Sequence, residues 1–231
     1  MISQLKRDLQ KLKNPEKIKI YSNFFKTGKG QYGEGDKFLG ITIPQQRAIA
    51  KKYPNLTLKD IQKLLNDPIH EIRITALIIL VEQYKKADES LKNKIYNFYM
   101  KNSKKMNNWD HVDCTAPYIA GPHLLNKNKS ILYKFAKSKN LWERRISIIT
   151  TYHFIKNNKF TDTIKIAEIL LKDDHDLIHK AVGWMLREVG KKDQKLLEKF
   201  LKKHHKIMPR TMLRYSIEKF TESKRKFYMK K

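Results

Sequence analysis

The sequence predicts an all-α protein built from repeated helix pairs. Residues that form turns are scarce, since the 231 residues include only 8 glycines and 7 prolines. Apolar residues recur at intervals of three and four along most of the chain, which is the spacing of one helix face. No convincing strand pattern is present, because β-branched runs such as Ile146–Thr151 lie within this helical periodicity. Helices should therefore account for almost all of the regular structure.

Two helices are expected before the first glycine. The first covers Ile2–Leu12 and places three leucines on one face. The second starts at Asn14 and Pro15 and runs through Phe25. Asparagine is a favoured N-cap, and proline is favoured at the first helical position.

The segment Gly28–Gly40, with the sequence GKGQYGEGDKFLG, is the only glycine-rich stretch. A phosphate-binding P-loop is disfavoured here, because the segment lacks a GK[ST] ending and no strand precedes it. Two interpretations remain open. The segment is either a basic and aromatic loop that contacts DNA through Lys29 and Tyr32, or a simple connector.

The remaining helices follow from the same periodicity and from local start signals. Thr57 is the expected cap of one helix, and Asp67-Pro68 precedes the most apolar one. The expected helices are Ile43–Lys52, Thr57–Leu65, His70–Lys86, Ser90–Lys105, Ser130–Ala136, Leu141–Ile155, Thr161–Leu171, Leu177–Val189, Gln194–His204 and Arg210–Phe220.

Four helical segments of the sequence can be aligned with one another by their apolar pattern. They start at His70, Asn108, Trp142 and Leu177. The alignment places Arg73, Asp113, Arg145 and Lys180 at one position, followed three residues later by Ala76, Ala116, Ile148 and Gly183. Intervals of 32 to 40 residues are typical of helix-pair repeats of the HEAT kind. The predicted fold is a right-handed solenoid of about six such pairs, whose equivalent positions line a basic concave groove.

The charge of the chain indicates a polyanionic partner. Fifty Lys and Arg residues against 23 Asp and Glu residues give a net charge of +27. A compositional bias toward lysine is the alternative explanation, but it does not account for the shortage of acids. One domain is expected over residues 1–222, followed by a basic tail at 223–231 that is either disordered or a nonspecific DNA arm.

Other bulk features suit a protein of the bacterial cytosol. Cys114 is the only cysteine, so neither a disulfide nor a cysteine-based zinc site is expected. The first residues form a charged amphipathic helix rather than a signal peptide. No apolar run reaches the roughly 18 residues of a membrane span.

The stretch Asn107–Gly121 combines acidic, aromatic and apolar residues at helical spacing. Trp109 and Asp113 are one turn apart and share a helix face, whereas Asp110 and His111 point elsewhere. A carboxylate beside an indole ring can stabilise a cation. The alternative is a structural helix with a buried tryptophan and an aspartate that caps it or pairs with a base.

All three tryptophans lie near the aligned position. Trp109 precedes Asp113 by one turn, Trp142 precedes Arg145, and Trp184 follows Lys180 by one turn. A core role for each remains the alternative, since tryptophan is usually largely buried. Three tryptophans around one acidic residue favour a functional site over a purely structural role.

Four motifs resemble those of the AlkD family of DNA alkylation repair proteins, over nearly the whole chain. They are FLGITIPQQR at Phe38–Arg47, NNWDHVD at Asn107–Asp113, LWERR at Leu141–Arg145 and KAVGWMLREVGK at Lys180–Lys191. The resemblance implies a HEAT-like solenoid that holds duplex DNA in its groove. It also implies release of cationic N3- or N7-alkylated purines without flipping of the base into a pocket.

The resemblance further implies catalytic roles for Trp109, Asp113, Arg145 and Trp184, which match the residues of the family. Asp113 would stabilise the oxocarbenium-like sugar and position water, while the two tryptophans would pack on the sugar and backbone. Arg145 would hold a phosphate, with its neighbour Arg144 as the rival for that role. The remaining expected DNA contacts are Arg73, Lys180, Arg187, Lys29, Tyr32 and Arg47. No metal or organic cofactor is required, and a monomer is expected.

The sequence thus favours a monofunctional alkylpurine DNA glycosylase. The first alternative is a non-catalytic solenoid that binds distorted or branched DNA, because a loop like Gly28–Gly40 belongs to only some branches of the superfamily. The second alternative is a protein-binding or RNA-binding scaffold.

Overall fold

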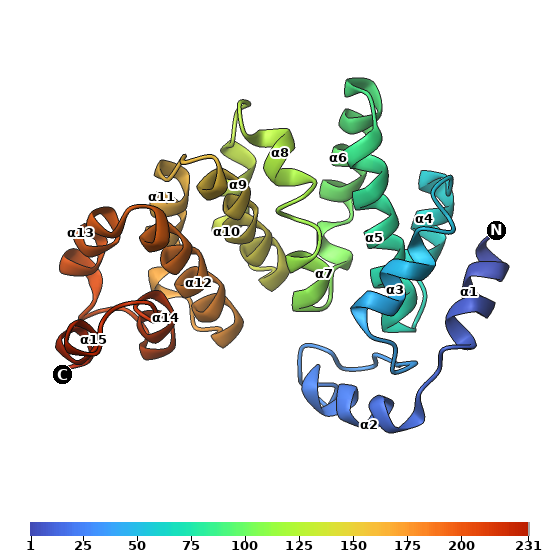
Figure 1. The fold of residues 1–231 in the computed structure, drawn as a ribbon, viewed down its shortest axis with the longest axis horizontal. Helices are drawn as coiled ribbons and strands as arrows, with labels where there is room; N and C mark the ends of the chain where they lie inside the picture. Colours follow the sequence, from blue (N-terminus) through green and yellow to red (C-terminus); the bar gives the residue numbers. More distant parts are fainter. Residues whose placement is uncertain (231) are drawn as a thin grey trace. The chain divides into compact units, whose positions relative to one another are not determined.

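The computed structural model describes residues 1–230 and confirms an all-α fold (Figure 1). No β-strand occurs among these residues, and a single parallel bridge joins Lys37 to Ile69. The chain divides into two compact units, which we call unit 1 (Met1–Thr115) and unit 2 (from Ala116 onward). None of the described helices is long and apolar enough to cross a membrane.

Unit 1 is organised around its longest helix, α5. Its elements are α1 (Ile2–Gln10), α2 (Pro15–Phe24), α3 (Ile43–Ala50), α4 (Leu58–Leu65), α5 (His70–Lys86), α6 (Glu89–Lys101), the 3₁₀ turn η1 (Ser103–Lys105) and α7 (Trp109–Asp113). Helix α5 contacts α1, α3, α4, α6 and α7. It is apolar around most of its circumference, and all of its residues from His70 to Val81 are buried. A helix without a polar face must be covered on all sides, which explains its central position.

The predicted start signals of two helices are confirmed. The Asn14 side chain accepts a hydrogen bond from the Lys17 amide at 3.1 Å, with Pro15 in the first turn of α2. Thr57 and Asp60 form a capping box at the start of α4. These ends are determined locally because each cap bonds within its own first turn.

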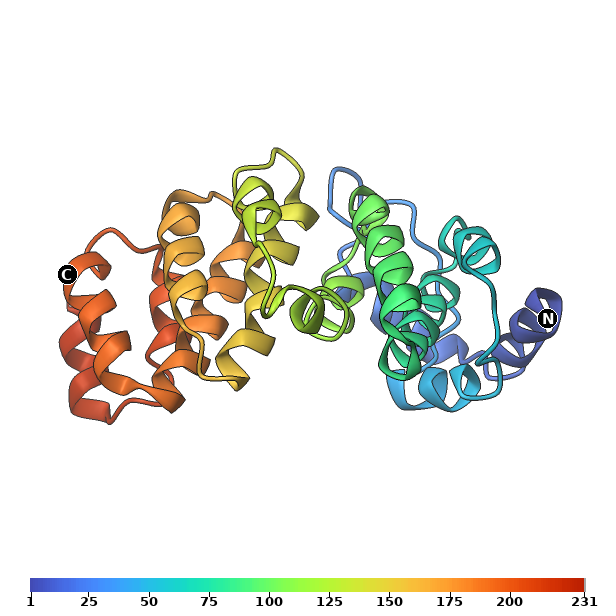
Figure 2. The same cartoon turned by 90° about the horizontal axis from the view of Figure 1, so that it is seen from above.

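Unit 2 consists of helices stacked in sequence order, which Figure 2 shows side by side in yellow to red. They are α8 (Ala120–Leu124), α9 (Ser130–Ala136), α10 (Leu141–Lys156), α11 (Thr161–Ile169), η2 (Leu170–Lys172), α12 (Asp176–Lys192), α13 (Gln194–His204), α14 (Arg210–Ser216) and α15 (Glu222–Met229). Helix α12 packs between α10 and α14, while α9, α11 and α13 pair with their neighbours along the chain. This is the arrangement of helix-pair repeats.

The small residue at the repeat position of α12 allows close packing. A Cβ atom added to Gly183 would lie 2.5 Å from the Met212 carbonyl oxygen and 2.5 Å from the Tyr215 Cβ. A Cβ atom does not approach non-bonded atoms this closely, so α12 and α14 can pack at this distance only because position 183 is glycine.

Most of the basic segment from Ser223, for which either disorder or a nonspecific DNA arm was expected, lies in a helix. This helix is α15, whose Tyr228 is buried and contacts the rings of His205 and Phe220. Arg210 donates a 2.7 Å hydrogen bond to the Met229 carbonyl oxygen. Sequence composition missed this helix because one buried tyrosine anchors an otherwise polar segment.

Candidate functional site

Helix α7 presents Trp109 and Asp113 on one accessible face. Both side chains are partly exposed, whereas Asp110, His111 and Val112 are buried. The Asn108 side chain starts the helix by accepting a hydrogen bond from the Trp109 amide at 2.9 Å. The structure therefore confirms that Trp109 and Asp113 share a face and that Asp110 points into the interior.

Two phenylalanines at the end of α2 hold the Trp109 ring. Phe25 stacks on it with centroids 5.5 Å apart, and Phe24 meets it edge-on at 5.7 Å. Phe25 is itself buried and stacked on Phe38 at 5.4 Å. Sequence reasoning did not identify this support, because the Phe24-Phe25 pair lies some 85 residues before Trp109 and local spacing cannot relate them.

The buried face of α7 is tied to α5 through His70. The His70 Nε2 atom lies 2.8 Å from Asp110 Oδ2, and its Nδ1 atom lies 3.3 Å from Asp36 Oδ2. Burial by itself lowers the pKa of His70, but the charge and hydrogen bond of Asp110, together with the hydrogen bond to Asp36, raise this pKa to about 9. His70 is therefore protonated at neutral pH and bridges two carboxylates.

Arg73, which the sequence predicts to contact DNA, belongs to the same interior network. Its guanidinium lies 2.7 Å from Asp36 Oδ1 and donates to the Asn107 side chain at 3.2 Å and to the Asp67 carbonyl at 2.8 Å. The side chain is buried. The phosphate contact predicted for Arg73 stays a prediction, which the ion pair with Asp36 disfavours because it neutralises the charge of the guanidinium.

The second half of the Gly28–Gly40 segment is a structural element. The Glu71 carboxylate accepts hydrogen bonds from the amides of Leu39, Gly40 and Ile41 at 2.9, 2.7 and 3.2 Å. This anchoring places Asp36 next to His70. In the first half, Lys29 is exposed and Tyr32 is partly exposed. Their predicted contact with DNA remains a prediction.

His70, Asp110 and His111 each offer a possible metal ligand, with the ligand atoms within 4.8 Å of one another. His111 stacks on His70 at 4.6 Å and lies off the Trp109 face, as expected. Burial, and then the positive charges of His70 and Arg73, hold the pKa of His111 well below its usual value. Because both ring nitrogens of His70 already face carboxylates, we interpret the cluster as an ion-pair network that fixes α7.

Cys114 follows Asp113 at the end of α7 and lies within electrostatic reach of Arg47. Burial raises the pKa of Cys114 to about 12, aided by the negative charges of Asp110 and Asp113 and opposed by Arg47. The thiol is therefore protonated and is a poor nucleophile. Arg47 itself is exposed on α3, where a DNA contact is sterically open.

In unit 2 the neighbouring Arg144 and Arg145 are both bonded. Arg144 pairs with Asp173 at 2.6 Å and donates to the carbonyls of Ser138 and Lys139. Arg145 is buried and donates to the Leu177 carbonyl at 2.5 Å, near the start of α12. Both arginines thus fix the contact between α10 and the segment that leads into α12.

Helix α12 carries Lys180, Trp184 and Arg187 at intervals of four and three, so they form one stripe along the helix. All three are partly exposed. Lys180 pairs with Asp176 at 2.6 Å, Trp184 packs against Tyr152 at 5.7 Å, and Arg187 pairs with Glu218. Trp142, by contrast, is buried and belongs to the core of the unit.

Comparison with known proteins identifies the family. The model of a family described as DNA alkylation repair enzyme matches residues 5–220. The chain belongs to this family, and DNA is therefore its partner. Helix α15 lies beyond the matched region.

A solved structure supports the fold. The structure described as "Predicted DNA alkylation repair enzyme from Enterococcus faecalis" superimposes with a TM-score of 0.70 at 17% sequence identity. The match covers 91% of this chain and 97% of that chain. No curated protein matches the sequence.

Proposed function

We propose that this protein is a monofunctional DNA glycosylase that hydrolyses the N-glycosidic bond of cationic N3- or N7-alkylated purines in duplex DNA. The observation that carries the proposal is the accessible Trp109–Asp113 face of α7, whose opposite face is fixed by the buried His70–Asp110 pair.

Cleavage of this glycosidic bond requires an anion that stabilises the developing positive charge of the sugar more than it requires a general acid. An alkylated purine already carries a positive charge, so the C1′–N bond breaks with the electron pair on the departing neutral base. The sugar becomes oxocarbenium-like, and the Asp113 carboxylate stabilises it electrostatically. Water then adds to C1′ and gives up a proton, which Asp113 can accept. The products are the free base and an abasic sugar.

Trp109 contributes the second attractive surface. An indole face near a cationic sugar supplies about 0.5–2 kcal/mol of cation–π attraction. The stack on Phe25 restricts the ring, so less conformational entropy is lost when DNA binds. The tie between Asp110 and His70 likewise restricts the backbone that carries Asp113.

Unit 2 would supply contacts to the DNA backbone and sugar. Trp184 is partly exposed within the stripe of Lys180 and Arg187, as a packing and phosphate-binding surface requires. The phosphate contact that the resemblance implies for Arg145 stays a prediction, because its guanidinium is buried and bonded to the Leu177 carbonyl.

The proposal is tested by measuring release of N7-methylguanine and N3-methyladenine from methylated duplex DNA. Asp113→Asn should bind DNA as the wild type does but release base roughly 100-fold more slowly, as expected for loss of one electrostatic stabiliser. Asp174→Asn removes the same charge from an exposed position in unit 2 and should leave release unchanged. Equal rates for wild type and Asp113→Asn would refute the mechanism.

A non-catalytic DNA-binding protein is the second candidate. The exposed Phe24 ring, 58% accessible, lies edge-on to Trp109 and offers an apolar surface for distorted DNA. Wild-type protein that binds methylated and branched duplexes tightly but releases no base would establish this function instead.

A further inference from the structure

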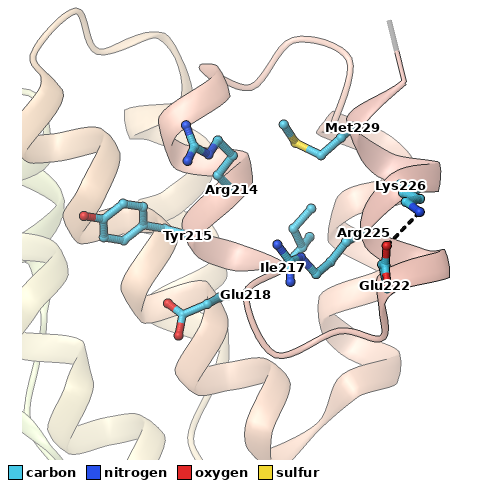
Figure 3. A pocket seen from close by; sticks show the side chains of 8 residues that line it. All are labelled: Arg214, Tyr215, Ile217, Glu218, Glu222, Arg225, Lys226 and Met229. Atoms are coloured by element: carbon cyan, nitrogen blue, oxygen red, sulfur yellow. Dashed lines mark ion pairs between the residues drawn. The ribbon is translucent and has the colours of Figure 1, made fainter.

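A basic pocket lies between α14 and α15, at and beyond the end of the family-matched region (Figure 3). The cavity has a volume of about 410 Å³. Three cations line it, Arg214, Arg225 and Lys226, together with the carboxylates of Glu218 and Glu222.

Each of the two acids of the pocket is paired with a cation other than Arg214 and Arg225. Glu218 pairs with Arg187 and, at 3.1 Å, with Lys219. Glu222 pairs with Lys226 at 2.7 Å, the contact drawn in Figure 3. Within residues 1–230, neither Arg214 nor Arg225 has a carboxylate within ion-pair distance. The pocket therefore holds two guanidinium groups whose charge is not compensated.

Arginine is rare in this chain, which makes its position informative. The sequence contains nine arginines and 41 lysines. A surface position that requires only a positive charge is therefore expected to be lysine in this chain. Arginine differs by offering a planar fork of donors that matches two oxygens of one phosphate. Arg214 and Arg225 are exposed and come from different helices that face one cavity.

The pocket adjoins the stripe on α12. The ion pair between Glu218 and Arg187 joins the rim of the pocket to the stripe. Tyr215, another lining residue, packs against Gly183 one residue before Trp184. Both contacts lie within unit 2. Direct contacts within unit 2 therefore join the pocket to the α12 stripe.

We propose that Arg214 and Arg225 form a phosphodiester-binding site that grips the backbone of the same DNA duplex beyond the α12 stripe. The proposal uses DNA as the partner and is independent of whether the protein cleaves a glycosidic bond. Its occupant is the duplex backbone rather than a free anion, because the site adjoins the α12 stripe, which the proposed function places on DNA.

The effect on affinity follows from counterion release. Each phosphate neutralised on duplex DNA adds about 0.9 to the slope of log K against log salt. Loss of two contacts should therefore reduce the slope by about 1.8. If the variant and the wild type bind equally at 1 M salt, this difference in slope corresponds to a loss of roughly 60-fold in affinity at 0.1 M salt.

The experiment compares Arg214→Gln/Arg225→Gln with Lys195→Gln/Lys199→Gln, which removes two charges from exposed positions on α13. Affinity for an unmodified duplex is measured by fluorescence anisotropy over a series of salt concentrations. We expect the arginine pair to lose the stated slope and affinity and the lysine pair to retain both. Equal losses in the two variants would show a general charge effect and overturn the proposal.

Two further measurements separate the remaining outcomes. Titration with inorganic phosphate tests a free-anion site: phosphate binding that needs both arginines, with an unchanged salt slope for DNA, would overturn the proposal. The second measurement is single-turnover base release by the wild type, which separates this proposal from the proposed function. Absence of release from wild type would refute the glycosylase but would leave the affinity comparison, and hence this proposal, unaffected.

Discussion

The ion pair between His70 and Asp110 should make the stability of the protein depend on pH in a defined direction. The pKa of His70 is raised from 6.5 to about 9 in the folded state. Because folding raises the pKa of His70, its contribution to the free energy of unfolding is fully present at pH values below the unfolded pKa, near 6.5. This contribution is lost as the pH rises through the folded pKa of about 9. Each pKa unit corresponds to about 1.4 kcal/mol, so the contribution is about 3 kcal/mol. His70 is 1% exposed, so solvent screening does not reduce this figure.

The assay is urea unfolding followed by circular dichroism at a series of pH values between 6 and 9.5. The free energy of unfolding of the wild type should fall by about 3 kcal/mol more than that of His70→Gln over this range. Asp110→Asn should also remove much of the pH-dependent difference, because it deletes the partner that contributes most to the raised pKa. Parallel curves for wild type and His70→Gln would refute the ion-pair network and reopen the His70, Asp110 and His111 cluster as a metal site.

Two further predictions test how the buried network is built. Gly40→Ala should destabilise the protein by more than about 2 kcal/mol, since its φ is +79° and the new Cβ would lie 2.3 Å from the Asn14 carbonyl oxygen. Gly35→Ala, at φ +83° with open space around it, should cost only about 1 kcal/mol; equal costs in thermal unfolding would contradict the packing argument. Arg73→Met should lower the free energy of unfolding by about 3–5 kcal/mol, because the buried negative charge of Asp36 loses one of its two cationic partners. The salt slope for DNA binding should not change, and a reduced slope would restore Arg73 as a DNA ligand.

The two faces of α7 have separate physical tasks. The inner face uses charge: Asp110 is neutralised by His70, and Asp36 by His70 and Arg73. The outer face leaves Asp113 partly exposed beside Trp109. A helix of five residues has too few internal hydrogen bonds to hold its own position. The network and the aromatic stack therefore supply the rigidity that a preorganised site requires.

Within unit 2, close helix packing positions the other candidate residues. Gly183 brings α14 against α12, and Arg145 bonds the carbonyl of Leu177. Trp184 and Arg187 then extend from a helix that is held on two sides. The stripe on α12 thus rests on the same repeat packing that defines the fold.

The sequence by itself predicted most of the helices, the repeat pattern and the shared face of Trp109 and Asp113, but not the helices α8 and α15. Helical periodicity and N-caps depend on residues three or four apart, so the caps at Asn14 and Thr57 could be identified locally. The motif residues likewise indicated the family correctly, because each motif is a short run.

Only the tertiary structure decided which charged residues face solvent. Arg73 pairs with Asp36, which lies 37 residues earlier, and His70 pairs with Asp110, which lies 40 residues later. Arg145 is buried against Leu177, and the segment from Ser223 is ordered by Tyr228. A charged residue can be read from sequence, but its burial depends on whether a distant chain segment brings a compensating partner, and no local pattern contains that information.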